Sequence, residues 1–155
     1  MDTLQLFLAH AIKLETEAAR GYEEMTAAMQ TLGNREARDF FRQMAHYARL
    51  HQADAMARGG FNDVPLLAEY EYQWPDGTSP ERAEWAGIDG LTDELAAMQV
   101  ALEAEFRAQA YYAAVAATAS DPEVRALATE FAAEESEHVA ALEARISARL
   151  TRAKT

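Results

Sequence analysis

Apolar residues recur every three or four positions over most of the chain, which is the spacing of amphipathic helices. The pattern predicts long helices at about residues 3–32, 35–58, 91–119 and 122–150. Gly33 ends the first helix and Asn34 can cap the second, so these two helices form an antiparallel pair with a tight turn. Thr92 can cap the third helix, and Asp121-Pro122 provides a stop and restart before the fourth.

The stretch from about residue 59 to 90 interrupts this pattern with prolines, glycines and the aromatic residues Tyr70, Tyr72 and Trp74. A connection of this length can return along a helix of ~25 residues, roughly 37 Å, so the third helix would run parallel to the second. We expect the aromatic residues to pack the connection onto the helices, and Ser79-Pro80-Glu81 to open a short helix. The prediction is an all-α four-helix bundle with one long crossover connection between helices 2 and 3, in a single domain spanning residues 1–155.

Composition agrees with this fold and narrows the functions. Half of the residues are hydrophobic and Gly and Pro are few, which favours closely packed helices. The net charge of −12 disfavours nucleic acid and anionic membranes as partners. The absence of cysteine excludes disulfides, thiolate zinc sites and a Cys-ligated iron centre on this chain. We find no signal sequence and no apolar run that could span a bilayer, so we expect a cytoplasmic protein.

The first and third helices share an internal repeat. Each presents a Glu among small residues in an apolar stripe, with a Tyr two turns later: Glu15 and Tyr22, then Glu105 and Tyr112. A Glu at that place faces the core, where an ionised carboxylate needs a cation or several hydrogen-bond donors. A slightly rotated helix would instead put either Glu at the surface, but the repeated setting favours the inward orientation.

Helices two and four supply imidazoles. Glu135 and His138 stand three residues apart, so they share a helix face and can bind one metal ion together. His51 lies on the apolar face of the second helix. A lone inward His is usually an ordinary core residue, but the company of His138 and the two helix Glu residues favours a metal ligand. His10 and His46 fall off the inner faces, and we expect both at the surface.

Together these residues resemble the rubrerythrin-type branch of the ferritin-like superfamily over nearly the whole chain. In that branch two helices each give one Glu and two each give a Glu-x-x-His pair, and these residues bind two irons. The resemblance implies the metal ligands Glu15, His51, Glu105, Glu135 and His138. It assigns Glu15 and His51 to one metal and Glu105 and His138 to the other, with Glu135 able to bridge them.

The resemblance also implies roles for residues around the ligands. Tyr22 and Tyr112 match tyrosines near the ligands, where they would donate hydrogen bonds or quench radicals, although packing alone would also account for them. In related bundles an acid before the Glu-x-x-His pair can hydrogen-bond the outer nitrogen of the opposite His. We therefore hypothesise that Glu134 orients His51, and that Tyr47, the counterpart of Glu134, faces the other ligand His.

Two positions depart from the pattern of that branch. Ala48 stands where a bridging Glu is expected, three residues before His51, and Ala108 stands where rubrerythrins carry an extra Glu. The three remaining carboxylates do not balance the charge of two divalent ions, so water, hydroxide or another anion would complete the coordination. We expect weaker and unequal metal occupancy. Asp54, one turn after His51, is a weaker candidate for the missing ligand, because Asp is short and this one lies on a different row of the helix.

The leading prediction is a non-haem dimetal carboxylate protein with two irons per chain at full occupancy, Zn or Mn being other divalent candidates. By resemblance it binds and oxidises iron or reduces peroxide or dioxygen, as a di-iron oxidoreductase of peroxidase or ferroxidase type. Without a Cys-ligated iron domain it would need a separate electron donor. The alternative, favoured by Ala48, is a redox-inactive metal-binding or structural bundle, and a cage subunit for iron storage is a weaker one. We expect a homodimer that contacts neither nucleic acid nor membrane.

Overall fold

The structure is a computed structural model of the chain, and it describes residues 1–74, 79 and 93–153. The long helices are α1 (Thr3–Leu32), α2 (Arg35–Gly59), α4 (Glu94–Thr118) and α5 (Pro122–Ala153), and a short 3-10 helix, η1 (Glu69–Glu71), lies in the connection. The long helices form an all-α four-helix bundle, as predicted, and no strand occurs among the described residues.

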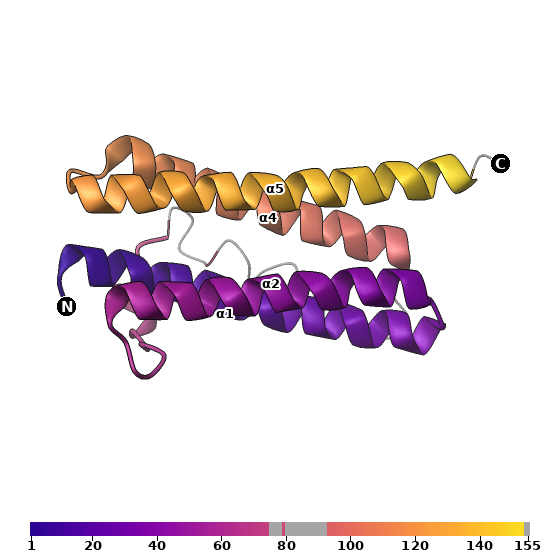
Figure 1. Cartoon of the computed structure of the whole chain (residues 1–155), viewed down its shortest axis with the longest axis horizontal. Helices are drawn as coiled ribbons and strands as arrows, with labels where there is room; N and C mark the ends of the chain where they lie inside the picture. Colours follow the sequence, from indigo (N-terminus) through magenta and orange to yellow (C-terminus); the bar gives the residue numbers. More distant parts are fainter. Residues whose placement is uncertain (75–78, 80–92, 154–155) are drawn as a thin grey trace.

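The helices pack as two antiparallel pairs, α1 with α2 and α4 with α5 (Figure 1). In this view α1 and α5 run in one direction along the long axis, and α2 and α4 run in the other. Because α2 and α4 are parallel, the chain must return along the bundle between them. The predicted crossover connection is therefore confirmed.

Short-range hydrogen bonds set where α1 and α2 begin and end. Asp2 and Gln5 form a capping box in which each side chain accepts a hydrogen bond from the other residue's backbone N–H, at 2.7 and 3.3 Å. Asn34 caps α2. Gly33 and Gly60 follow the two helices in the left-handed region, at φ 73° and 70°, where glycine carries no steric penalty.

The cap of α4 lies one residue later than the sequence suggests. The Asp93 carboxylate accepts a hydrogen bond of 2.7 Å from the Ala96 N–H, so Asp93 and not Thr92 is the cap residue. Both residue types form good caps, and the start of the helix decides between them. Thr92 itself lies outside the described residues.

The connection is held to the bundle by part of its aromatic cluster. Tyr72 is buried and stacks on Trp74 at a ring-centroid distance of 5.5 Å, as expected, whereas Tyr70 is 88% exposed. The short helix predicted at 79–81 lies outside the described residues apart from Ser79, which is buried. Within the described part of the chain, no helix is long and apolar enough to cross a membrane.

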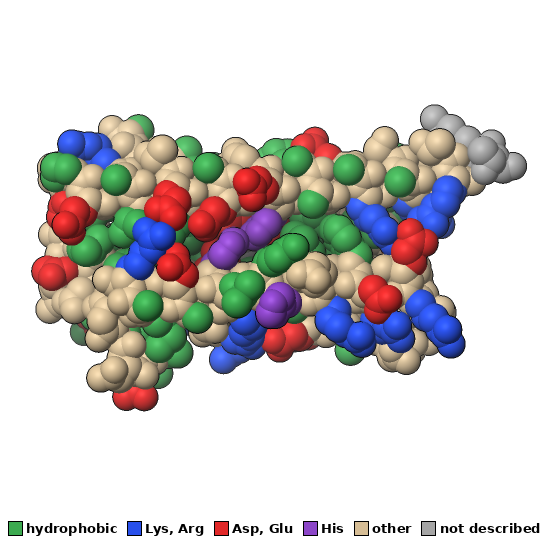
Figure 2. All heavy atoms as spheres, viewed as in Figure 1, with side chains coloured by type: hydrophobic (Ala, Val, Ile, Leu, Met, Phe, Trp, Pro, Cys, Tyr) green, Lys and Arg blue, Asp and Glu red, His purple; other side chains and the backbone are tan. Residues whose placement is uncertain are grey.

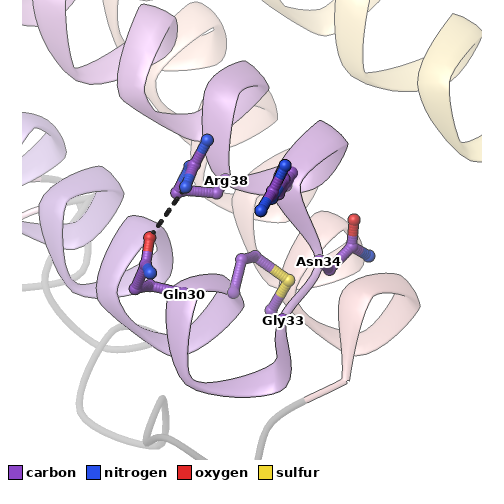
Figure 3. Close-up of a pocket in the computed structure, with 6 residues that line it drawn as sticks. Gln30, Gly33, Asn34 and Arg38 are labelled. Atoms are coloured by element: carbon purple, nitrogen blue, oxygen red, sulfur yellow. Dashed lines mark hydrogen bonds between the residues drawn. The ribbon is translucent and has the colours of Figure 1, made fainter.

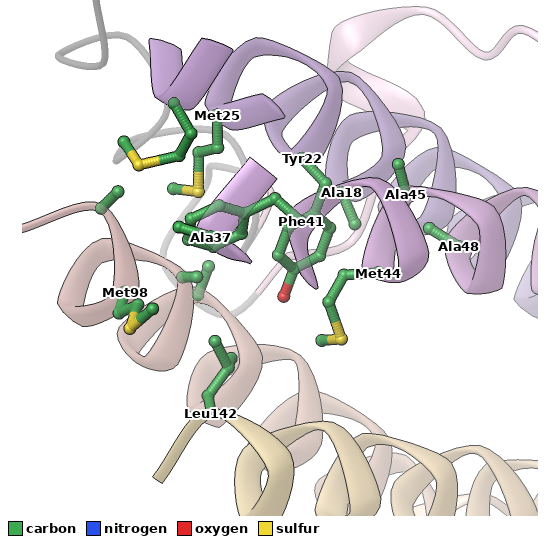
Figure 4. Packing of buried hydrophobic residues seen from close by; sticks show 14 of the residues in the cluster. Ala18, Tyr22, Met25, Ala37, Phe41, Met44, Ala45, Ala48, Met98 and Leu142 are labelled. Atoms are coloured by element: carbon green, nitrogen blue, oxygen red, sulfur yellow. The ribbon is translucent and has the colours of Figure 1, made fainter. Parts of the chain in front are cut away.

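Two clusters of buried side chains fill the bundle. Figure 4 shows part of the first, which includes Ala18, Tyr22, Met25, Phe41, Met44, Ala48, Met98 and Leu142. The second includes Phe7, Leu8, Ile12, Leu14, Ala55, Tyr112, Val124 and Phe131. Fully burying a large apolar side chain contributes about 1.5–3 kcal/mol, so these clusters are the main source of the fold's stability. On every long helix the predicted ligands fall between them.

Candidate metal centre

A layer of charged side chains separates the two apolar clusters. Each long helix contributes to it, and it contains all five predicted ligands: Glu15, His51, Glu105, Glu135 and His138. The three carboxylates are buried, at 6%, 1% and 4% exposure in that order. Three buried acids in one layer require cations or donors, because an ionised carboxylate loses its hydration in the core.

The better-defined half of the layer consists of Glu105, Glu135 and His138. The Nδ1 atom of His138 lies 3.5 Å from Oε2 of Glu105 and 3.4 Å from Oε2 of Glu135. One ligand atom from each residue lies within 4.8 Å of the other two. Metal bonds to nitrogen and oxygen ligands are about 2.0–2.2 Å long, so small shifts would bring these atoms around one ion. The donor set fits a metal.

The other half consists of Glu15 and His51. The Nδ1 atom of His51 lies 3.7 Å from Oε1 of Glu15, and it is buried without a hydrogen-bond partner among the described residues. A buried polar atom left in that state is costly, and a metal ion would satisfy it. Ala48 is buried, at 2% exposure, and brings no oxygen to this half.

The two halves meet at their histidines. The rings of His51 and His138 stack with centroids 5.2 Å apart and planes at 11°. Both rings turn Nδ1 toward carboxylates, which gives the two halves the same orientation. Figure 2 shows neighbouring histidine side chains between the two helical pairs, with acidic side chains beside them. The arrangement suits two ions side by side.

The electrostatics of the layer favour bound cations. Burial by itself would raise the pKa of Glu105, but contacts with Glu135, His138 and Tyr22 outweigh it and the pKa is lowered. The contact with Glu15 raises the pKa of His51 against the effect of burial. Burial lowers the pKa of His138, yet Glu105 more than offsets it and the pKa is raised. A proton or a metal ion therefore satisfies the same positions, and the two compete.

Tyr22, Glu134 and Tyr47 all lie near the predicted ligands, but each makes a different kind of contact with them. The Tyr22 hydroxyl donates a hydrogen bond of 2.6 Å to Oε1 of Glu105, which leaves Oε2 directed at His138. Glu134 approaches the outer Nε2 atom of His51 at 3.8 Å, longer than a hydrogen bond. Tyr47 lies against His138, with ring centroids 6.4 Å apart and planes at 14°.

Asp54 does not substitute for the carboxylate that position 48 lacks. Its side chain pairs with Arg58, at 3.1 and 3.2 Å, and is 45% exposed. Arg58 also binds Glu130 of α5 at 2.7 and 2.9 Å, so the three side chains form a surface ion-pair network. The half of the layer around His51 therefore has two predicted ligands, Glu15 and His51.

The expectation that His10 lies at the surface is wrong, because its side chain is buried at 2% exposure. Its Nδ1 atom lies 2.8 Å from the Leu6 carbonyl oxygen, and Nε2 accepts a hydrogen bond of 2.8 Å from the Gln73 N–H. The rings of Tyr72 and Trp74 lie against it at 5.2 and 4.8 Å. The helical angle of His10 gave no sign of this, because the covering residues come from the crossover connection. His46 is exposed, as expected.

The pocket in Figure 3 lies elsewhere, at the turn between α1 and α2. It encloses about 400 Å³ and is lined by Met29, Gln30, Gly33, Asn34, Arg35 and Arg38. Arg38 donates a hydrogen bond of 3.0 Å to the Gln30 side chain across it. The lining contains neither a carboxylate nor an imidazole, so it does not extend the metal site.

Comparison with known proteins agrees with the fold. Residues 93–155 match the ferritin-like domain family. The crystal structure of an uncharacterized conserved protein from Magnetospirillum magnetotacticum MS-1 is similar to the chain, with 38% sequence identity and a TM-score of 0.76. The match covers 94% of this chain and 95% of that one. No protein with a curated description matches. The chain belongs to the ferritin-like superfamily.

Proposed function

We propose that the chain is a non-haem dimetal carboxylate protein of the rubrerythrin type, which binds two irons and reduces peroxide or dioxygen. The stacked pair of His51 and His138, each turning Nδ1 toward buried carboxylates, carries the proposal. Carboxylate and imidazole ligands suit iron, while manganese and zinc are the competing divalent ions. When bound, two ferrous ions supply the two electrons that convert peroxide to water.

The protein's own residues would hold and shield that centre. The Tyr22 hydroxyl fixes Glu105 by its hydrogen bond of 2.6 Å, so the carboxylate stays oriented toward His138. The apolar clusters on either side of the layer keep bulk water away from the buried acids. Access comes from the side of the bundle where α2 and α5 lie, because the side chains of His51 and Glu134 are 23% and 29% exposed.

A specific observation favours a second candidate, a metal-binding bundle without redox activity. Ala48 removes a bridging carboxylate, and among the described residues Glu105, Glu135 and His138 form the group in which three ligands meet. A chain that filled only this group would hold one ion. A single ferrous ion supplies one electron at a time, which is insufficient for the concerted reduction of peroxide.

Anaerobic iron titration followed by peroxide separates the two candidates. The proposal predicts binding of two ferrous ions per chain and a near-ultraviolet ferric absorption after peroxide. Binding of one ion without that absorption would instead establish the redox-inactive bundle. His46→Ala is the matched control, because His46 is an exposed histidine of α2 outside the charged layer. Its titration should equal that of the unaltered chain.

A further inference from the structure

A line of oxidisable aromatic side chains leads from the crossover connection toward the charged layer. Tyr72 stacks on Trp74 at 5.5 Å, and Trp74 meets Tyr111 of α4 edge-on at 5.2 Å. Tyr111 and Tyr112 lie at 5.4 Å from each other. Each ring is in contact with the next, since aromatic pairs in proteins lie about 4.5–7 Å apart.

The outer end of this line reaches solvent. Trp74 is half-buried. Tyr111 borders an open cavity of about 180 Å³, to whose lining Thr3, His10 and Gln73 contribute polar groups. A water molecule occupies roughly 10–15 Å³ of such space, so the cavity has room for water beside Tyr111.

The inner end lies one to two helical turns from predicted metal ligands. Tyr112 is fully buried and packs edge-on against Phe131, one turn before Glu135, at 5.5 Å. Tyr112 also lies two turns after the predicted ligand Glu105 on α4, as Tyr22 lies two turns after Glu15 on α1. The chain of ring contacts therefore joins the surface at Trp74 to the edge of the charged layer.

We propose that Trp74 and Tyr111 form a port for single electrons, by which a one-electron reductant at the surface reduces the metal site through the ring of Tyr112. The port rests on the proposed redox function, which needs an outside donor because the chain has no cysteine to hold an iron centre of its own. Tryptophan and tyrosine give up single electrons far more readily than phenylalanine. The neighbouring rings of Phe7 and Phe131 serve packing alone.

Each passage through the port moves one electron inward and leaves both side chains as they began. Tyr111 would give one electron to the metal site that peroxide has oxidised, and its phenolic proton to water in the cavity. Trp74 then gives one electron to the oxidised Tyr111, which takes a proton back from the water. Trp74 is left as a radical cation. A reduced iron–sulfur or flavin protein restores Trp74 with one electron. Two passages, with two protons, turn one peroxide into two waters.

The surroundings of the two tyrosines assign them different roles. Burial raises the pKa of Tyr111, so its hydroxyl keeps its proton until the ring is oxidised. Its place at the cavity then lets the proton leave. Tyr112 is fully buried and lies between Tyr111 and Phe131, with ring centroids 5.4 and 5.5 Å away. Its ring therefore acts as a bridge across which the electron passes, and it stays reduced.

Photo-oxidation of the metal-free full-length chain tests the port without any metal chemistry. The chain would carry Trp85→Phe, so that Trp74 is its single tryptophan, and Tyr72→Phe, so that Tyr111 is the tyrosine left in contact with Trp74 among the described residues. A ruthenium tris-bipyridine photo-oxidant with persulfate generates the tryptophan radical, which transient absorption follows. We expect it to convert to a tyrosyl radical, and to persist when Tyr111→Phe is added. Equal decay with and without Tyr111 would overturn the port. Tyr70→Phe, an exposed control, should change nothing.

A second experiment measures electron delivery to the iron-loaded chain. After peroxide treatment, ascorbate is added and the loss of ferric absorption is timed. Trp74→Phe and Tyr111→Phe should slow that loss while iron stoichiometry stays the same, and Tyr70→Phe should match the unaltered chain. Equal rates in all variants would refute delivery through the port. If no ferric absorption forms in any variant, the redox function itself fails, and photo-oxidation alone decides the port.

Discussion

The imidazole rings of His51 and His138 stack at 5.2 Å although they come from different helical pairs. His51 belongs to α2 and His138 to α5, and each faces a buried Glu from the helix paired with its own: Glu15 of α1 and Glu105 of α4. A metal ion held by these residues would therefore tie buried side chains of the layer together. Metal binding and folding are coupled wherever the ligands come together only in the folded state.

Metal loading should therefore stabilise the fold. A metal at 100 times its dissociation constant adds about 2.7 kcal/mol to the free energy of unfolding, which calorimetry of metal-free and loaded protein would detect. His138→Ala should abolish most of that gain. His46→Ala should retain it, because His46 is exposed and outside the layer. An equal gain in the His138 variant would contradict the assigned ligand.

Restoring a carboxylate at position 48 should raise metal affinity. Ala48 is buried beside the charged layer, so Ala48→Glu introduces a buried acid that destabilises the metal-free chain. Bound metal should recover this loss, and isothermal titration should show tighter binding of the second ion. Ala48→Gln has nearly the same volume without the charge. If the Gln variant binds metal as tightly as the Glu variant, position 48 does not act through a carboxylate.

Glu135 should matter more than Glu15. It is the one carboxylate that the two histidine-bearing helices contribute to the predicted ligand set, and it lies 3.4 Å from His138. Glu135→Gln should weaken binding of both ions, beyond the roughly 10–100-fold effect of losing a supporting hydrogen bond. Glu15→Gln should weaken the His51 half alone. Competition with a coloured chelator measures both variants, and equal, single-ion losses would argue against a bridging role for Glu135.

Removing the Tyr22 hydroxyl should loosen Glu105. Hydrogen bonds to charged groups contribute about 1.5–3 kcal/mol, and the bond from Tyr22 to Glu105 is 2.6 Å long and buried. Tyr22→Phe should lower the free energy of unfolding in denaturant titrations by a similar amount and weaken binding at the His138 half. Tyr70→Phe, at an exposed position, should leave both quantities unchanged. A stable Tyr22 variant with full metal affinity would rule out a positioning role for its hydroxyl.

His10 should make stability depend on pH. Burial lowers its pKa below the ordinary value of about 6.5 for histidine, and its Nε2 atom already accepts the Gln73 N–H. Below pH 6.5 the unfolded chain therefore binds the proton more readily than the folded chain, so stability falls as the pH drops toward the lowered pKa. The free energy of unfolding should fall more steeply with acid in the unaltered chain than in His10→Gln. Parallel pH profiles would contradict this.

The sequence predicted the helices and the charged layer because both leave local signals. Glu15 and Glu105 stand out as acids within apolar stripes, and the helical period alone places His51 on an inner face. The structure gathers these residues between two apolar clusters. The helical period could not predict which of these residues lie close enough to share one ion, because that depends on how α4 and α5 pack.

The burial of His10 could not be predicted from the sequence, because it depends on residues far away along the chain. Its helical angle points away from the bundle interior, yet Gln73, Tyr72 and Trp74 close over it from more than 60 residues along the chain. Contacts of that separation carry no periodic signal. The position of the α4 cap was uncertain for a different reason, because adjacent Thr92 and Asp93 both suit a cap and local pattern places helix ends only within a residue or two.

Metal analysis of the protein as purified, repeated after incubation with excess ferrous iron without oxygen, tests the dimetal site most directly. We expect iron in the purified chain, rising to two per chain on incubation, with both ions lost in a His51→Ala and His138→Ala double variant. A chain that takes up no iron beyond what the double variant binds would contradict the site.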